Sequence, residues 1–273
     1  MADDLAIDYP PDQHVLRDLS LVVSPTGEGR AEARTELTPS LLRAGEPVPG
    51  VLTTVVDALG GHLAMFAVVP DWMATGELTL HRWGTPVGAL SYDGTVLRRG
   101  RTLLVVRVTA ADERGPVAAS TMTFAVLPRR AGTPALDPEA LAALPRRMQL
   151  APVGDPAAPP GVPAALTAAI GYRVTSEGAE IAVAPYVRNS FGALNGGIVA
   201  GLAETAAVGE RAGVARQLTV HYLRQATAGP VVTRQRSLGD VGGLDGHEVE
   251  VVDRGADDRL CALATVLVDR RAG

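Results

Sequence analysis

The chain has 273 residues, of which 47% are hydrophobic and 20% charged, and its formal net charge at pH 7 is −5. This length is typical of two domains of about 100–150 residues each, and the negative charge argues against a nucleic-acid-binding surface. All 25 basic residues are arginine, which excludes a lysine Schiff base and the lysine of a phosphate-binding P-loop.

Several familiar catalytic and metal-binding patterns are absent from the sequence. The single cysteine, Cys261, excludes disulfides and cysteine-rich metal sites. The histidines show no metal-ligand spacing such as HExxH, and no GxSxG nucleophile elbow occurs, which disfavours an α/β-hydrolase. We therefore expect no metal and no cofactor, and chemistry carried by carboxylates, amides, hydroxyls and the backbone.

Targeting and membrane signals are also missing. The N-terminal segment MADDLAIDYPPDQ is acidic and has no apolar signal-peptide core. No uninterrupted run reaches about 18 apolar residues, so we expect no membrane span. The sequence thus predicts a cytoplasmic protein, and its lysine-free composition, rich in alanine and arginine, indicates a bacterium with a GC-rich genome.

The first half of the chain has the pattern of a strand pair, one apolar helix and three further strands. The pair spans 19–37 around a glycine-containing turn, and the helix spans about 50–62. Three strands, with a turn at 111–116, complete an N-terminal domain over 1–127.

A segment rich in proline and alanine, residues 128–164, separates this half from the next. It carries only a short helix signal, in which Asp137 is the cap, Pro138 occupies the first turn and Glu139 follows. We predict a linker here, followed by a C-terminal domain over 165–273.

The second half repeats the pattern of the first in the same order. A strand pair at 172–187 and an apolar helix at about 196–210 precede three strands that turn at 253–258. Four segments match in order: PGVLTTVVDALGG (49–61) with GGIVAGLAETAAV (196–208), LTLH (78–81) with LTVH (218–221), VRV (106–108) with VEV (249–251), and ASTMTFAV (119–126) with ALATVLVD (262–269). We therefore predict an α+β double hotdog: two long helices, each wrapped by a largely antiparallel sheet of five to six strands, related by a pseudo-twofold axis.

Acidic side chains interrupt both apolar helices at equivalent positions. The first match places Asp57 opposite Glu204. A buried carboxylate costs several kcal/mol unless it is paired or hydrogen-bonded, so each has either a catalytic role or a structural partner. Ahead of the second helix, Asn195 is a good N-cap, and Gly196 and Gly197 leave the N–H groups of the first turn uncovered.

The segment YVRNSFGALNGGIVAGLAETAA (186–207) resembles the signature of the PaaI-like hotdog acyl-CoA thioesterases, roughly N-x-x-G-x-x-H-G-G followed by an acidic residue. Asparagine stands where the signature usually has histidine, and the matching positions are Asn189, Gly192, Asn195, Gly196, Gly197 and Glu204. The resemblance covers both halves, about 100 residues each, and is specific only in the second. Chains with two such halves resemble double-hotdog thioesterases, in which the pair mimics a homodimer.

The resemblance implies thioester hydrolysis, with an oxyanion-binding N–H from one half and a carboxylate from the other. A first site would combine the Gly196 N–H and Asn189 with Asp57. A second would combine the N–H at position 49 with Glu204, but Pro49 has no N–H to donate and leucine stands in place of the asparagine. We therefore expect an intact first site and a degenerate second one. Whether the carboxylate acts as a general base or as a nucleophile stays open.

The remaining candidates for substrate contact are Asn195, Gly197 and Thr205. The expected substrate is an acyl-CoA or acyl-carrier-protein thioester, and no nucleic-acid or membrane partner is expected. One chain would form a complete dimer-like unit, and a homo-oligomer of such units stays open. Two other functions also stay open: a non-catalytic acyl-thioester-binding protein, and a hotdog enoyl-thioester hydratase, although the sequence has no Asp/His pair with hydratase-like spacing.

Overall fold

The computed structural model describes residues 9–19, 21–129, 139, 170–211 and 213–270. The predicted linker therefore lies almost entirely outside the described residues. So do two positions of its helix signal, Asp137 and Pro138, and the predicted boundary at 164/165.

The first half supplies six strands of one continuous twelve-stranded sheet. From the edge to the centre they are β1 (Val22–Gly27), β2 (Arg30–Glu36), β6 (Ala89–Arg99), β7 (Leu103–Asp112), β8 (Gly115–Leu127) and β5 (Trp72–Arg82). Neighbouring strands are antiparallel. The expected alternation is clear in β7, where Leu104, Val106 and Val108 are buried and Arg107 is exposed, so one face of the sheet is apolar.

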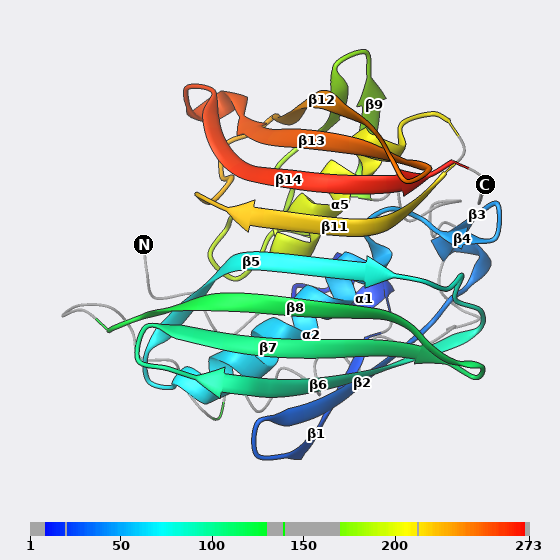
Figure 1. Cartoon of the computed structure of the whole chain (residues 1–273). Helices are drawn as coiled ribbons and strands as arrows, with labels where there is room; N and C mark the ends of the chain where they lie inside the picture. The colour runs from blue at the N-terminus through cyan, green and yellow to red at the C-terminus, as the bar shows by residue number, and fades with distance from the viewer. Residues whose placement is uncertain (1–8, 20, 130–138, 140–169, 212, 271–273) are drawn as a thin grey trace.

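The second half supplies six strands in the mirrored order. From the centre outward they are β11 (Val214–Tyr222), β14 (Arg259–Asp269), β13 (Leu244–Asp253), β12 (Val231–Val241), β10 (Gly178–Ile181) and β9 (Arg173–Thr175). Strands β5 and β11 pair at the centre, with Thr79 opposite Thr219 (Figure 1). The two threonines are equivalent positions of the LTLH and LTVH repeats, so the pseudo-twofold axis passes between them.

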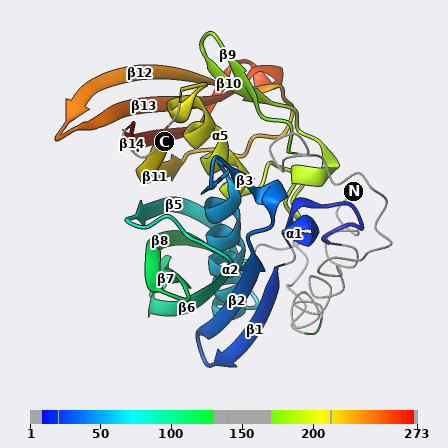
Figure 2. The same cartoon turned by 90° about the vertical axis from the view of Figure 1, so that its right-hand side faces the viewer.

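The two predicted helices lie side by side within the curve of the sheet. They are α2 (Val51–Val68) and α5 (Gly196–Val208), and Figure 2 shows the sheet bending around both. Helix α2 is longer than predicted because its apolar sequence continues to Val68, just before Pro70. Shorter elements complete the described chain: α1 (Val15–Asp18), β3 (Leu42–Arg43), β4 (Glu46–Pro47) and 3-10 turns at Pro39–Leu41, Pro185–Val187 and Arg254–Ala256.

Helix α2 is long and apolar enough to cross a membrane, with 18 residues of mean hydropathy 1.6. However, 72% of it is buried inside the protein, against the sheet and α5. A helix that is apolar on all sides and covered by protein is a core helix. We therefore interpret α2 as the buried centre of the first half.

Glycines allow the two helices to cross at unusually short range. A Cβ atom at Gly197 would lie 2.6 Å from the carbonyl oxygen of Thr53, and one at Gly201 would lie 2.5 Å from the Cα of Gly50. The hydroxyl of Thr53 donates a hydrogen bond to the Gly197 carbonyl at 2.9 Å across the crossing. The backbone of α5 thus rests directly on the first turn of α2.

We predict that Gly197→Ala destabilises the protein by at least 1–3 kcal/mol, roughly the cost of overpacking a close contact, because the helices must separate. Gly61→Ala is the matched control. Gly61 lies inside α2, and the nearest atom to an added Cβ is Met73 Cε at 3.6 Å, so alanine should stabilise the helix by about 0.5–1 kcal/mol. Chemical unfolding of both variants measures the two effects. Equal unfolding free energies for both variants would contradict the close crossing.

Candidate active site

Each acidic side chain of one helix meets the N-terminus of the other helix. The Gly197 N–H donates to Asp57 Oδ2 at 3.1 Å, and the Gly50 N–H donates to Glu204 Oε2 at 3.0 Å. A helix N-terminus carries uncovered N–H groups and about half a positive charge, which favours a carboxylate. The close crossing therefore creates two pseudo-equivalent carboxylate sites.

The N–H groups that hold the carboxylates belong to the residues that follow the two positions predicted to face an oxyanion, Gly196 and Pro49. Gly197 and Gly50 donate to the carboxylates, which the sequence analysis does not foresee. Gly50 caps α2 in a left-handed conformation (φ 91°).

Asp57 is almost fully buried, with 7% of its surface exposed. Besides the Gly197 N–H, its carboxylate accepts a long hydrogen bond of 3.5 Å from the Thr75 hydroxyl of β5. Burial raises the pKa of Asp57 to about 6, and the hydrogen bonds from Gly197 and Thr75 oppose this increase. The group is therefore ionised at neutral pH yet basic enough to accept a proton.

The first turn of α5 presents a further N–H beside this carboxylate. Asn195 caps the helix by accepting the Gly197 N–H at 2.9 Å, as predicted for an N-cap. Within the described ranges, the Gly196 N–H has no hydrogen-bond acceptor. A Cβ at Gly196 would lie 2.9 Å from Asp57 Oδ1, which shows how close this peptide is to the carboxylate. The hydroxyl of Tyr222 donates at 2.8 Å to the Gly196 carbonyl, which belongs to the next peptide group, the one that carries the Gly197 N–H.

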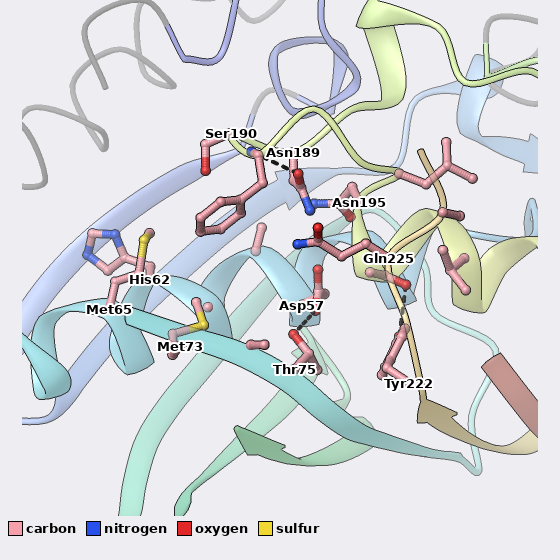
Figure 3. A pocket seen from close by; sticks show the side chains of 18 of the residues that line it. Asp57, His62, Met65, Met73, Thr75, Asn189, Ser190, Asn195, Tyr222 and Gln225 are labelled. Carbon is pink, nitrogen blue, oxygen red and sulfur yellow. Dashed lines mark hydrogen bonds between the residues drawn. The ribbon is translucent and has the colours of Figure 1, made fainter. Parts of the chain in front are cut away.

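Asp57 and Gly196 both line a cavity of about 430 Å³ between the two halves of the protein. Figure 3 shows the polar groups Asn189, Asn195, Tyr222 and Gln225 gathered around Asp57. Further along α2 the wall is mainly apolar, and it is formed by Ala58, Gly61, Met65, Met73, Val199 and Phe191. The cavity thus has a polar end at the carboxylate and an apolar body, as is typical of small-molecule sites.

Asn189 lines the cavity but uses its side-chain oxygen to shape the loop. Its Oδ1 accepts the N–H groups of Phe191 at 2.9 Å and Ala193 at 3.2 Å. Only its amide NH₂ is left for a substrate. Asn189 therefore lies at the site as a hydrogen-bond donor only, because its side-chain oxygen is already used.

Two of the three predicted substrate contacts, Thr205 and Gly197, do not line the described cavity. The Thr205 hydroxyl donates to the Gly201 carbonyl at 2.7 Å, one helical turn earlier, and it is absent from the cavity wall. Gly197 also lies behind the wall, where its N–H is shared by Asp57 and Asn195. Both residues make hydrogen bonds within the helix pair and do not contact the cavity.

The site around Glu204 differs from the site around Asp57 at equivalent strand positions. Arg82 of β5 corresponds to Tyr222 of β11 through the LTLH and LTVH repeats, and Arg82 is 5% exposed. Burial raises the pKa of Glu204, while the Gly50 N–H and the charge of Arg82 lower it. Arg82 also forms an ion pair with Glu46 of β4. Burial outweighs the other two effects, so the pKa of Glu204 lies above its usual value, and Glu204 does not line the described cavity.

The polar residues of the cavity that sequence reasoning missed include Tyr9, Thr75, Tyr222 and Gln225. Tyr9 comes from the N-terminal segment, where burial and the Asp57 charge raise its pKa and contact with Asn195 lowers it. The signal for Tyr222 was present, since it follows the matched repeats at the position where the first half has arginine. No local pattern marks the other three.

In the described part of the chain, no three His, Cys, Asp or Glu side chains gather as a metal ion would require. The polar groups that line the cavity are one carboxylate, one uncovered N–H, several amides and hydroxyls, the His62 imidazole and the Arg224 guanidinium.

No protein-family model matches the chain, and no curated protein sequence does. Solved structures do match over nearly the whole length. A putative thioesterase II from Thermobifida fusca is 19% identical, with a TM-score of 0.56 and coverage of 93% of this chain and 96% of that one. A hot dog fold protein of unknown function from Alicyclobacillus acidocaldarius is 16% identical, with a TM-score of 0.58 and coverage of 94% and 97%.

An acyl-ACP thioesterase from Bacteroides thetaiotaomicron is 12% identical, with a TM-score of 0.57 and coverage of 88% and 98%. At these identities the likeness shows the fold. The chain has the hotdog fold. This likeness, the two long helices and the mirrored strand order confirm the predicted α+β fold.

We predict that Asp57→Asn stabilises the fold at neutral and alkaline pH. The pKa of Asp57 rises from 3.8 to about 6 on folding, so ionisation weakens the fold as pH increases through this window, and the cost is complete above pH 6. Two pKa units correspond to about 3 kcal/mol. Chemical unfolding should show this gain for the variant at pH 8 and almost none at pH 4. A gain of the same size at both pH values would contradict the shifted pKa.

Proposed function

We propose that this protein is a thioesterase that hydrolyses an acyl-CoA or acyl-carrier-protein thioester at Asp57. The observation that carries the proposal is the juxtaposition of a carboxylate with a pKa of about 6 and the uncovered Gly196 N–H, at the polar end of a largely apolar cavity. The likeness to solved hotdog thioesterases and the resemblance of residues 186–207 to the PaaI-like signature support the same function.

The proposed reaction begins with the thioester carbonyl oxygen accepting a hydrogen bond from the Gly196 N–H. The positive end of the α5 dipole then stabilises the oxyanion that forms when the carbonyl is attacked, and one such donor contributes roughly 2.7–4 kcal/mol in comparable sites. Asp57 takes a proton from the attacking water as the new C–O bond forms. Collapse of the tetrahedral intermediate breaks the C–S bond, and the proton passes to the thiolate to give the free thiol and the acid.

The same geometry also permits direct attack by the Asp57 carboxylate on the carbonyl carbon. That step releases the thiolate and leaves a mixed anhydride, which water then hydrolyses to regenerate the carboxylate. Both routes need an ionised Asp57 and give the same products.

We further propose that only one of the two pseudo-equivalent sites turns over substrate. At the position equivalent to Gly196 stands Pro49, which has no N–H for an oxyanion. The N–H of the next residue, Gly50, is occupied by the Glu204 carboxylate itself. The charge of Arg82 further reduces the basicity of Glu204.

Asp57→Asn should lower kcat by about 10²–10⁴-fold with little change in KM, because it removes the base without removing the cavity. Glu204→Gln is the matched control, since it makes the same isosteric change at the pseudo-equivalent site, and it should retain most turnover. Thiol release from a panel of acyl-CoA thioesters measures both. An inactive Glu204→Gln enzyme with a normal Asp57→Asn enzyme would assign the reaction to the other site.

The pH dependence of kcat/KM should follow the ionisation of Asp57. The base acts only when it is deprotonated, so kcat/KM should rise with pH, reach half of its plateau near pH 6 and fall about tenfold per unit well below that value. A pH-independent kcat/KM between pH 5 and 8 would contradict this role. A wild-type protein that releases no thiol from any acyl-CoA or acyl-carrier-protein thioester would favour a binding protein instead.

A further inference from the structure

Tyr9 brings a hydroxyl group to the cavity that has no role in the proposed reaction. The residue lies in the N-terminal segment, is only partly buried and lines the cavity together with Asp57 and Gly196. Its hydroxyl oxygen is not sealed off, in contrast to that of Tyr92, which is fully buried and has no partner among the described residues. Tyr9 thus places a polar group in the electrostatic reach of Asp57 from a segment outside both long helices.

Contacts with the second half hold this N-terminal segment in place. His14 accepts the Leu16 N–H at Nδ1, at 3.2 Å, so its other nitrogen, Nε2, is the donor to the Arg188 carbonyl at 2.8 Å. The Tyr186 hydroxyl donates to Asp18 Oδ2 at 2.8 Å. Both contacts fall on the loop that leads into α5. The segment that carries Tyr9 is therefore docked on the loop that leads to the oxyanion-binding N–H.

Tyr9 itself is positioned by two neighbours in the same segment. Its ring meets the ring of His14 edge to face, with a centroid distance of 5.1 Å and an interplanar angle of 73°. The Arg17 guanidinium donates to the carbonyls of Pro10 at 3.0 Å and Pro11 at 2.7 Å, which braces the backbone directly after Tyr9. A donor that is fixed before the substrate binds needs no reorganisation at the moment of reaction.

The surroundings of the Tyr9 hydroxyl leave its proton available to a substrate. Asn195 Oδ1 is taken by the Gly197 N–H, so the Asn195 contact that lowers the pKa of Tyr9 comes from the amide NH₂ group. Asp57 accepts its hydrogen bonds from Gly197 and Thr75, and the Tyr9 O–H has no acceptor in the described part of the chain. Burial and the Asp57 charge raise the pKa of Tyr9 above its usual value, so the hydroxyl stays protonated and acts as a donor.

We propose, on the basis of the thioesterase function above, that Tyr9 is a further catalytic residue, whose hydroxyl donates a second hydrogen bond to the thioester carbonyl oxygen beside the Gly196 N–H. The amide that contacts this hydroxyl belongs to Asn195, the residue directly before Gly196, so both donors lie at the first turn of α5. Their bonds to the oxygen strengthen as it becomes an oxyanion. The proton stays on Tyr9 throughout, and Asp57 remains the base or the nucleophile.

Tyr9→Phe removes the hydroxyl oxygen and keeps the ring against His14. It should lower kcat by about 10²-fold or more with little change in KM, as removal of one oxyanion donor does. Tyr186→Phe is the matched control, because its hydroxyl ties the same segment to the second half but lies outside the cavity wall, and it should retain most turnover. The pH at which kcat/KM reaches half of its plateau should stay near 6 in Tyr9→Phe, since Tyr9 donates no hydrogen bond to Asp57.

Ligand binding separates this inference from the proposed reaction. Calorimetry compares two analogues of an acyl-CoA: a ketone, in which a methylene group replaces the sulfur, and an S-alkyl thioether, in which a methylene group replaces the carbonyl. Both carry the acyl chain that is hydrolysed fastest, or a hexanoyl chain where no thioester is hydrolysed. Tyr9→Phe should weaken binding of the ketone by about three- to tenfold and leave that of the thioether unchanged. Tyr186→Phe should change neither.

An inactive wild-type protein whose ketone affinity still depends on the Tyr9 hydroxyl would reject the reaction and support the donor. Equal ketone affinities in the wild type and Tyr9→Phe would overturn the proposal, as would an equal loss for ketone and thioether, which indicates a structural role. So would an unchanged kcat in Tyr9→Phe, an equal decrease in Tyr186→Phe, or a shifted pH midpoint, which would mean that Tyr9 acts through Asp57. If Tyr9→Phe does not fold, Tyr9→Leu, which also lacks the hydroxyl, takes its place.

Discussion

The close crossing of α2 and α5 is the constraint on which the rest of this structure depends. Without a Cβ at Gly197 or Gly201, the backbone of one helix reaches the first turn of the other, and each carboxylate meets an N-terminus contributed by the opposite half. Neither half alone contains a carboxylate together with its N–H partner. The mirrored strand order and the central β5–β11 pair hold the crossing in place. Tandem duplication in one chain therefore gives a fixed pairing of two unlike halves.

Because the halves are unlike, the two carboxylates have diverged in their surroundings. Around Asp57, Tyr222 donates to the Gly196 carbonyl without adding charge, and Asp57, whose pKa is raised by burial, lines the cavity. Around Glu204, an arginine at the position of the tyrosine offsets the charge. The charge of Arg82 lowers the pKa of Glu204, although burial raises it more. The two carboxylates therefore differ in having one neutral and one cationic neighbour at equivalent strand positions.

Much of the fold could be predicted from the sequence, because four segments of the first half match four segments of the second half in the same order. Matches such as LTLH with LTVH set the strand equivalences, and the apolar segments with single acidic residues marked both helices. The hydrogen bonds from the Gly50 and Gly197 N–H groups to the carboxylates could not be predicted, because they depend on how closely the two helices cross. Tyr9 and Thr75 come to the cavity through tertiary contacts alone. The sequence also does not show that the Thr205 hydroxyl bonds its own preceding turn.

If the two pseudo-equivalent sites of one chain are functionally unlike, only the cavity at Asp57 should take up a substrate analogue. The stoichiometry of binding of a non-hydrolysable S-alkyl-CoA thioether to the full chain tests this, by calorimetry at a protein concentration well above Kd. We expect one molecule bound per chain, displaced when a bulky side chain replaces Gly61 in the cavity wall. Two equivalent molecules bound per chain, with the Gly61 variant unaffected at both, would contradict it.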